Sequence, residues 1–375
     1  KKKKTVASGT LPSGKPVIVN ADGTVSVVGT TTRSESVGTR AVFDNGQMDF
    51  TAVTFDSNSN KFVVAWRDNV NSYYGTAAVG TVDPSDNSIT YGSDTVFESA
   101  NTKQVAAGFD STNNKVVLAY KDGGNSNYGT AIVGTVSGTS ISFGTAVVFE
   151  SAITSDPSVV FDSNEGKIVI SYRDSGDTDK GKSTVGTVSG TSISFGSPVQ
   201  FGGSYAYYND STFDSTNNKV VLVWTDLNDS QKGKAIVGTV SGTSISFGSE
   251  VTFHANTTGE FNQVSFDSTS GKVVVAYVDG ADSNKGKALV GTVSGTSISF
   301  GSEAIFHNAA TYRNSLVYDP TSNKTLIAYS DASSSNGGTF VMATVSGTSI
   351  SFGSEAAFEA GEAANISTTY DSNND

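Results

Sequence analysis

The strongest constraint in this sequence is a nonapeptide, VSGTSISFG, that occurs five times without a single change. Its copies begin at Val136, Val188, Val240, Val293 and Val345. A second landmark, Phe-Asp-Ser or a close variant, recurs with the same period of about 52 residues over nearly the whole chain. Such regular spacing is typical of a fold built from identical units, each of which packs on its neighbours.

The sequence pattern of each repeat predicts four short strands and no helix. In one repeat the segments 104–110, 115–120, 130–136 and 141–149 are separated by turns rich in Ser, Gly, Asn and Asp. The second of them, KVVLAY, is apolar throughout, as expected for a strand buried on both faces. Four antiparallel strands in about 50 residues describe one blade of a β-propeller. A parallel β-helix is the alternative, but its coils are much shorter than this repeat.

The two ends of the chain predict that a seventh blade closes the ring. Six full repeats cover residues 52–359. The segment 15–43 matches strands two to four of a blade, and 365–375 matches only a first strand. We therefore expect an all-β fold, a seven-bladed β-propeller of four-stranded antiparallel blades, over residues 15–375. Residues 1–14 are expected to form an N-terminal extension.

Closure of that ring requires one specific pairing. Residues 368–370 are expected to pair with the strand that contains residues 17–19, which would bury two sheet edges that could otherwise template aggregation. The segment 5–10 is an alternative first strand for the seventh blade. The chain also stops where a second strand would begin, so continuation beyond Asp375 is a further alternative.

The two faces of the predicted propeller differ in how much their sequences vary. The first-to-second turns (DSTNN and similar) and the third-to-fourth turns (SGTS) are nearly constant and fall on one face. The nonapeptide is therefore expected to be a third-to-fourth hairpin whose Ile and Phe pack between blades. Identical neighbours demand identical packing, so its constancy requires no ligand.

The second-to-third loops and the segments that cross to the next blade vary, and both fall on the opposite face. A scaffold that is uniform on one face and diversified on the other indicates recognition, because binding residues concentrate on loops held by a rigid frame. Drift of loop sequences without function is the alternative.

Aromatic side chains on the variable face are the candidate ligand-binding residues. Tyrosine beside Asn, Ser and Asp suits saccharide or protein contacts, because the ring stacks while its polar neighbours form hydrogen bonds. Rings folded back over the blades are the alternative. The candidates are Tyr205, Tyr207, Tyr208, Asn209, Tyr312, Arg313, Tyr73, Tyr74 and Tyr128. The aromatic residues that end the second strands are assigned to packing: Trp66, Tyr120, Tyr172, Trp224, Tyr277 and Tyr329.

No catalytic residue, metal site or cofactor is predicted. A sialidase-type propeller needs a convergent arginine cluster for its substrate carboxylate, together with an acid and a nucleophile. The chain has only five arginines, and Arg67 and Arg173 are interpreted as repeat variants of Lys121, Thr225 and Val278. An enzyme is therefore the least favoured reading.

Two features resemble metal sites. His254 and His307 occupy equivalent positions in two repeats, but ligands from adjacent blades would lie too far apart to converge, so both are interpreted as polar loop residues. Asp177 and Asp179 lie in a D-x-D-x-G pattern similar to a calcium loop. The sibling loops lack this pattern, so solvated turn carboxylates are the preferred interpretation.

Charge and composition exclude several partners. The net charge of −12 opposes nucleic acid and anionic membranes. The chain has no cysteine, hence no disulfide or thiolate metal site, and no apolar run long enough for a membrane helix. The four lysines at the start precede a segment without an apolar core, so no signal peptide is predicted.

The repeat unit FDSTNNKVVLAYKDGGNSNYGTAIVGTVSGTSISFG and the opening VASGTLPSGKPVIVNADGTVSVV resemble repeat-bearing virion proteins of marine tailed bacteriophages. The resemblance covers almost all of residues 5–375 and implies a tail, fibre or capsid-appendage component located on the virion, hence extracellular. Its expected partners are a host cell-surface glycan or protein and other virion subunits. A purely structural decoration protein, whose loops contact only virion subunits, is the alternative, and it would not need the variable face for host recognition.

Overall fold

A computed structural model describes residues 6–7, 17–19, 24–27, 37–203 and 205–373 of this chain. The chain divides into two compact units, Lys1–Gly38 and Thr39–Asp375. The sequence predicted a boundary after residue 14, whereas the boundary between the units lies at Gly38.

The described part of the first unit is a three-stranded sheet with the order β1-β3-β2. It contains β1 (Val6–Ala7), β2 (Val17–Val19) and β3 (Thr24–Val27). Strand β2 is antiparallel to β3, and β1 is parallel to it. The expected pairing of residues 17–19 with 368–370 would join the two units and stays a prediction. The two strands β2 and β3 are separated by only four residues, and so short a connection costs little entropy to close.

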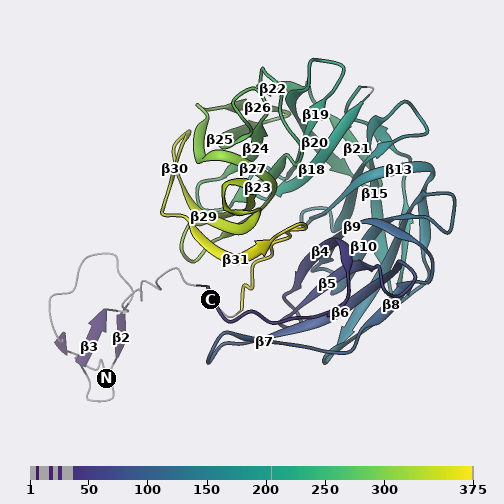
Figure 1. Ribbon diagram of the computed structural model, residues 1–375, viewed down its shortest axis with the longest axis horizontal. Helices are drawn as coiled ribbons and strands as arrows, with labels where there is room; N and C mark the ends of the chain where they lie inside the picture. Colours follow the sequence, from purple (N-terminus) through teal and green to yellow (C-terminus); the bar gives the residue numbers. More distant parts are fainter. Residues whose placement is uncertain (1–5, 8–16, 20–23, 28–36, 204, 374–375) are drawn as a thin grey trace, which may run out of the picture. The chain divides into compact units, whose positions relative to one another are not determined.

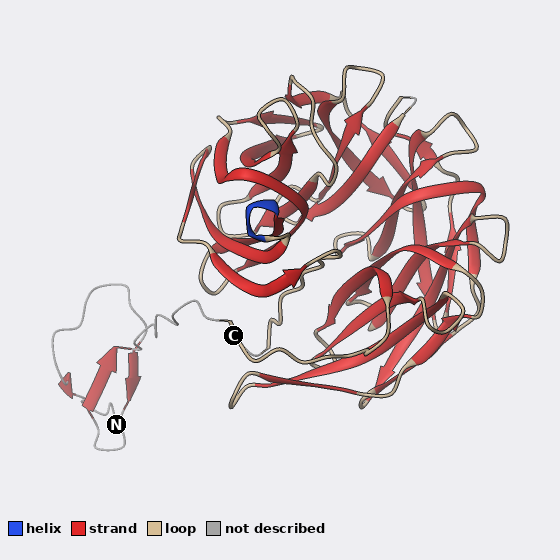
Figure 2. Cartoon of the chain, viewed as in Figure 1, coloured by secondary structure: helices blue, strands red, loops and turns tan. Residues whose placement is uncertain are grey.

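The second unit is an all-β, propeller-like array of six four-stranded antiparallel modules, which we call blades 1 to 6 (Figures 1 and 2). The six innermost strands are β4 (Met48–Asp56), β9 (Thr102–Asp110), β13 (Val147–Asp162), β18 (Ala206–Asp214), β23 (Gln263–Asp267) and β27 (Ala304–Asp319). The second strands are β5 (Lys61–Asp68), β10 (Lys115–Asp122), β14 (Lys167–Asp174), β19 (Lys219–Asp226), β24 (Lys272–Asp279) and β28 (Lys324–Asp331). The third strands are β6 (Tyr74–Asp83), β11 (Tyr128–Ser137), β15 (Lys180–Ser189), β20 (Lys232–Ser241), β25 (Lys285–Ser294) and β29 (Gly337–Ser346).

The fourth, outermost strand of each blade is broken into two pieces that pair with the same third strand. The first pieces are β7 (Ser88–Tyr91), β12 (Ser140–Phe143), β16 (Ser192–Phe195), β21 (Ser244–Phe247), β26 (Ser297–Phe300) and β30 (Ser349–Phe352). The second pieces are β8 (Thr95–Glu98), β17 (Val199–Gln200), β22 (Val251–His254), β31 (Ala356–Glu362) and the first halves of β13 and β27. The only helical element of the described residues is the 3₁₀ turn η1 (Ala332–Ser334), and no helix there is long and apolar enough to cross a membrane.

The core lies between neighbouring blades. Along β10, Val116 and Leu118 pack with residues of blade 1, whereas Val117 and Ala119 pack with residues of blade 3. Successive side chains of a strand point to opposite faces, so a strand covered on both faces must be apolar at every position. The continuous apolar second strands predicted this arrangement. The aromatic residues that end these strands are all fully buried, which confirms their assignment to packing.

The nonapeptide forms the predicted third-to-fourth hairpin. In its first copy Ser137 pairs with Ser140, so the turn has only two central residues, and Gly138 has a φ of 61°. A positive φ at the first central residue is the geometry of a tight hairpin turn that favours glycine. Ile141 is 4% exposed and lies in the core shared with blade 1.

Successive nonapeptides also contact one another. A methyl group added at Gly144, the last residue of one copy, would lie 1.8 Å from the carbonyl oxygen of Thr191 in the next copy. The same close approach occurs at Gly92, Gly196, Gly248 and Gly301. The constant sequence is therefore explained by contact between identical neighbours, because each copy has to fit the next.

The C-terminal segment lies between the innermost strands of blades 6 and 1. The amide of Thr368 donates to Ser315 Oγ at 3.0 Å, and the amide of Val53 donates to Ser367 Oγ at 3.1 Å. The same contact, from an amide to a side chain of the preceding innermost strand, joins β13 to β18 and β18 to β23. Residues 367–368 therefore make the contacts of an innermost strand, although they form no ladder.

A cleft of about 650 Å³ opens beside this C-terminal segment. Its walls are mainly apolar and include Phe55, Phe62, Ile89 and Leu326. On its edge Phe43 packs against Trp66 and Tyr91, as Phe97 packs against Tyr120 and Phe143 one blade later. The segment before β4 thus occupies the position of a fourth strand. No described strand fills the cleft beside it.

Candidate binding face

Hydrogen bonds place the variable segments on one face. In each second-to-third loop a backbone carbonyl accepts a hydrogen bond from the segment that crosses to the next blade. Examples are Thr102 N to Tyr73 O at 2.9 Å and Thr311 N to Asn284 O at 2.9 Å. The crossing segments were expected to be loops, but β13 and β27 run through two blades without a break. Pairing first with one blade and then with the next satisfies their backbone polar groups.

A ring of strained residues occupies this face. In β4, β9, β13, β18 and β27 the register with the second strand shifts by a β-bulge near the start of the innermost strand. At the bulge, or at the equivalent point before β23, one residue has a positive φ between 49° and 67°. We call these residues the bulge ring: Phe50, Gln104, Asp156, Tyr208, Phe261 and Arg313. Consecutive innermost strands lie side by side, as Figure 1 shows for β4 and β9 and for β18 and β23.

The residue types in the bulge ring are informative. A positive φ costs an L-residue about 1–2 kcal/mol, and glycine or asparagine is the usual occupant when only the backbone shape matters. None of the six is glycine or asparagine, and they include aromatic, acidic, basic and amide side chains. Strain is thus kept at one point of all six blades by five different residue types, which makes the bulge ring a candidate recognition site.

Neighbouring members of the bulge ring touch. Gln104 Nε2 donates to Asp156 Oδ1 at 2.9 Å, and Asn209 Nδ2 donates to the carbonyl of Asp156 at 2.7 Å. The rings of Tyr208 and Phe261 lie 5.8 Å apart. Burial, followed by the nearby Glu260, raises the pKa of Tyr208 to about 12.

Arg173 organises the centre of the site. Its Nε pairs with Asp156 at 3.0 Å and its Nη1 with Asp179 at 3.0 Å. The guanidinium lies 3.7 Å from the centre of the Tyr207 ring, and Tyr207 Oη donates to Asp179 at 3.2 Å. Burial is the main reason that the pKa of Tyr207 is raised. We call Arg173, Asp156, Asp179 and Tyr207 the Arg173 cluster. The Arg173 cluster therefore places a planar aromatic ring beside hydrogen-bond donors and acceptors that are held in position.

Blade 1 repeats this design. Arg67 pairs with Asp49, and its Nε donates to Asn69 Oδ1 at 2.8 Å. Its guanidinium lies 4.8 Å from the Phe50 ring and 5.2 Å from the Tyr73 ring, and Tyr73 is 47% exposed. Sequence reasoning dismissed both arginines as repeat variants. Each arginine lies opposite the residue before a bulge, and that bulge is seen only in the structure, so the sequence carried no signal for them.

The remaining predicted binding residues are scattered over this face. Tyr205 and Tyr312 are both 40% exposed, as expected for contact residues. Asn209 is buried and holds the neighbouring strand instead of reaching solvent. Arg313 belongs to the bulge ring and lies 3.8 Å from Glu362. Tyr74 and Tyr128 are half-buried at the starts of β6 and β11.

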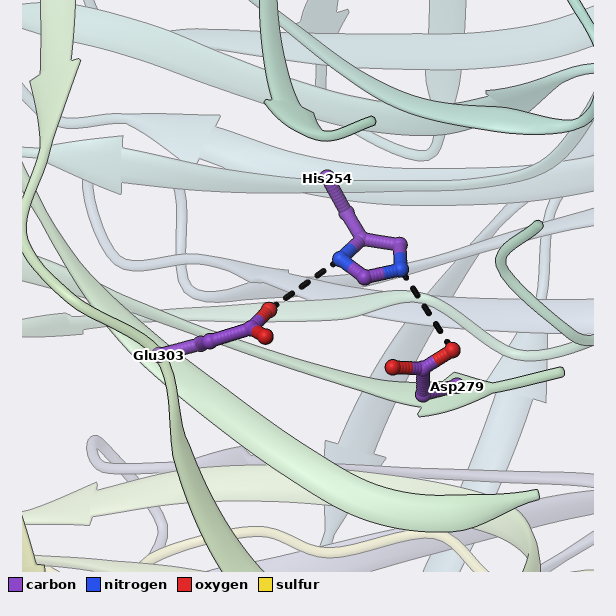
Figure 3. A group of neighbouring side chains, drawn as sticks. All are labelled: His254, Asp279 and Glu303. Atoms are coloured by element: carbon purple, nitrogen blue, oxygen red, sulfur yellow. Dashed lines mark hydrogen bonds and ion pairs between the residues drawn. The ribbon is translucent and has the colours of Figure 1, made fainter. Parts of the chain in front are cut away.

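The histidines are not loop residues, contrary to the sequence interpretation. His254 and His307 are 5% and 6% exposed and lie between blades. Each follows a phenylalanine of the fourth strand, and each packs against the tyrosine that ends the second strand of the next blade. Figure 3 shows His254 between two carboxylates, with Nδ1 at 3.1 Å from Glu303 and Nε2 at 3.4 Å from Asp279. This is the one group in the described residues whose spacing could hold a metal ion.

The contacts of the His254 group favour an ion-pair network over a metal site. The two carboxylates lie beside different nitrogens of the imidazole, so each already has its own partner atom on the ring. Lys287 Nζ already lies 2.7 Å from Asp279 and 3.2 Å from Glu303, and the pKa of this lysine is raised mainly by its hydrogen bonds to them against the opposing effect of burial. Asp279 Oδ1 also accepts the amides of Ala281 and Asp282.

The predicted calcium-like carboxylates have separate partners. Asp177 pairs with Lys180 at 2.9 Å and with Lys182 at 3.1 Å, whereas Asp179 pairs with Arg173. The two side chains are thus neutralised by different cations. An outer hollow of about 540 Å³ between β17 and β21 is lined by apolar groups such as Phe201 and Phe247 and by the polar side chains of Gln200, Ser246 and Glu250.

No protein-family model and no curated protein sequence matches this chain. Several solved structures share its fold. The BP39L lectin from Burkholderia pseudomallei is 10% identical, with a TM-score of 0.59 over 80% of this chain and 82% of that one. A Bacteroides uniformis protein named as a candidate 6-phosphogluconolactonase is 11% identical, with a TM-score of 0.58 over 82% of this chain and 85% of that one. A Lactobacillus plantarum protein is 11% identical, with a TM-score of 0.56 over 93% and 94%.

Proposed function

We propose that this protein is a carbohydrate-binding module that contacts glycans through its variable face. The bulge ring carries the proposal, because backbone strain is maintained in all six blades by five different residue types, none of them glycine or asparagine. The fold is shared with a lectin, which supports the same reading. The binding residues are the Arg173 cluster together with Tyr205 and Tyr208.

The chemistry of the Arg173 cluster suits a sugar. Aromatic faces stack on the C–H surface of a pyranose ring, while carboxylate, guanidinium and hydroxyl groups bond to its hydroxyls. The acids of the cluster are held in ion pairs with Arg173, which favours recognition over proton transfer. We therefore infer binding without catalysis, although one protein of similar fold is named after an enzymatic activity.

We further propose that the module belongs to a bacteriophage particle and recognises a glycan on the host surface. The sequence resemblance motivates this setting. A decoration protein that contacts only other virion subunits is the second candidate, and the repeated uniform face favours it. Immunogold labelling of particles would place the protein at the tail tip, along the tail or on the capsid, and a position away from host contact would favour decoration.

We also propose that the ring has seven blade positions. Residues 367–368 make the contacts of an innermost strand and Phe43 those of a fourth strand, so the cleft between them lacks a second and a third strand. The hairpin β2–β3 has the antiparallel order of those two strands and a matching sequence. Deleting residues 1–29 should then lower the melting temperature and increase binding of a hydrophobic dye. An unchanged protein would rule out this source of the strands.

The binding proposal is tested with a glycan array and two sets of variants. Arg173→Ala and Tyr208→Ala should lose most of the binding, because a few central aromatic and arginine residues carry most of the energy of an interface. Ser137→Ala and Ser189→Ala on the constant face are the matched controls and should bind normally. Loss of binding in the controls alone would show that the wrong face was chosen.

A further inference from the structure

Blade 2 differs from the other blades at the variable face in one respect. Lys103 of β9 and Lys121 of β10 are direct cross-strand partners. At the equivalent place blade 1 has the opposite charges Asp49 and Arg67, and blade 4 has Tyr207 and Thr225. Like charges that face each other across a ladder are destabilising, so this pair is a local cost in a protein with an excess of acids.

Within the described part of the chain, the two lysines form hydrogen bonds only to neutral side chains. Lys121 Nζ donates to Ser155 Oγ at 3.2 Å, and Lys103 Nζ lies 3.4 Å from Asn127 Oδ1. Asp122, the next residue along β10, uses its carboxylate to cap the loop through the amides of Gly124 and Asn125.

The lysine pair adjoins the Arg173 cluster. Ser155, the partner of Lys121, is also the cross-strand partner of Arg173. Burial, followed by the charges of Lys103 and Arg173, lowers the pKa of Lys121, while Asp156 and Asp179 oppose the shift. Three cations thus share this part of the face with the two carboxylates that pair with Arg173. Among the described residues the buried side-chain oxygen of Gln104 has no hydrogen-bond partner, so it is open to a donor such as a saccharide hydroxyl.

We propose that Lys103, Lys121 and Arg173 form an anion subsite of the glycan site, so that the ligand is an acidic saccharide bearing a carboxylate or a sulfate ester. This inference rests on the proposed function, because it specifies the ligand class of the same face. The net charge of −12 does not oppose it at close range. At physiological ionic strength charges are screened over about 8 Å, so the nearest cations dominate a bound anion.

The test uses four probes: tetragalacturonate and its carboxyl-reduced counterpart, and a sulfated galactan oligosaccharide and its desulfated counterpart. The full chain should bind at least one acidic probe about tenfold or more tightly than its neutral counterpart, and the preferred pair shows whether carboxylate or sulfate is recognised. The double variant K103Q/K121Q should lose that preference. K115Q/K167Q removes the same charge from the opposite face and should keep it.

A stability measurement separates a binding role from a folding role. Lys103→Glu creates the opposite-charge pair seen in blade 1, so it should raise the melting temperature slightly and abolish the preference for acidic probes. Equal affinity for acidic and neutral probes, or unchanged affinity in K103Q/K121Q, would overturn the anion subsite while leaving glycan binding intact. Failure of the wild type to bind any glycan of the array or any probe would overturn both proposals.

Discussion

Gly144 offers the sharpest test of why the nonapeptide does not vary. A methyl group at this position would lie 1.8 Å from the carbonyl oxygen of Thr191. An ordinary contact is roughly 3.5 Å, so Gly144→Ala must push the two neighbouring segments apart by about 1.7 Å. Both are held by their own ladders, and overpacking of this kind costs about 1–3 kcal/mol. Because the blocking atom belongs to the backbone, we expect a loss near the upper end, about 3 kcal/mol.

Urea denaturation of Gly144→Ala and Gly138→Ala measures this cost. Gly138 has open space around it and only its positive φ to oppose a side chain, so its substitution should cost about 1–2 kcal/mol. Adding Thr191→Gly to Gly144→Ala should restore little, because the carbonyl oxygen remains. If Gly144→Ala loses no more stability than Gly138→Ala, with equal m-values, contact between copies does not explain the repeated sequence.

Three further predictions follow from individual side chains. Burial raises the pKa of Asp210 to about 6, so its charged form opposes folding as the pH rises from about 4 to 6. Asp210→Asn should therefore gain stability relative to the wild type over that interval. A difference in unfolding free energy between the two proteins that stays constant with pH would contradict this. Lys287→Met leaves Asp279 buried without its cation and should cost about 3–5 kcal/mol in urea denaturation, whereas a neutral effect would refute the ion-pair reading of the His254 group. Arg313→Gly should be more stable than Arg313→Ala by roughly 0.5–1 kcal/mol in thermal unfolding, because only glycine relieves the positive φ; the opposite order would show that the bulge is unstrained.

The repeat predicted the blades because the packing between blades depends on residue types that the sequence shows directly. Continuous apolar second strands such as 115–120 require cover on both faces, and the constant Ile141 and Phe143 supply that cover. The glycine of the tight turn in each nonapeptide could also be predicted from the sequence. These features depend on the spacing of residues within one repeat and on contacts between repeats of nearly the same sequence. The sequence alone was therefore sufficient to predict them.

The site was only partly predictable. Tyr205, Tyr207 and Tyr208 could be chosen because tyrosines are conspicuous in a variable segment. The positive φ of Phe50 or Arg313 could not, since neither residue type favours that conformation. The Arg173 cluster draws its members from β13, β14, the following loop and β18, so it exists only once two blades are side by side. His254 was misassigned for the same reason, because its partners belong to the next blade.

The position of a bound glycan tests the assignment of the binding face most directly. The decisive measurement is a crystal structure of the protein with the tightest-binding oligosaccharide from the array. We predict that the sugar contacts Tyr207 or Tyr208 and lies within hydrogen-bond distance of the Arg173 cluster, on the face of the bulge ring. A sugar bound instead in the outer hollow beside Phe201 and Phe247, or on the face of the constant turns, would contradict the assignment of the binding face.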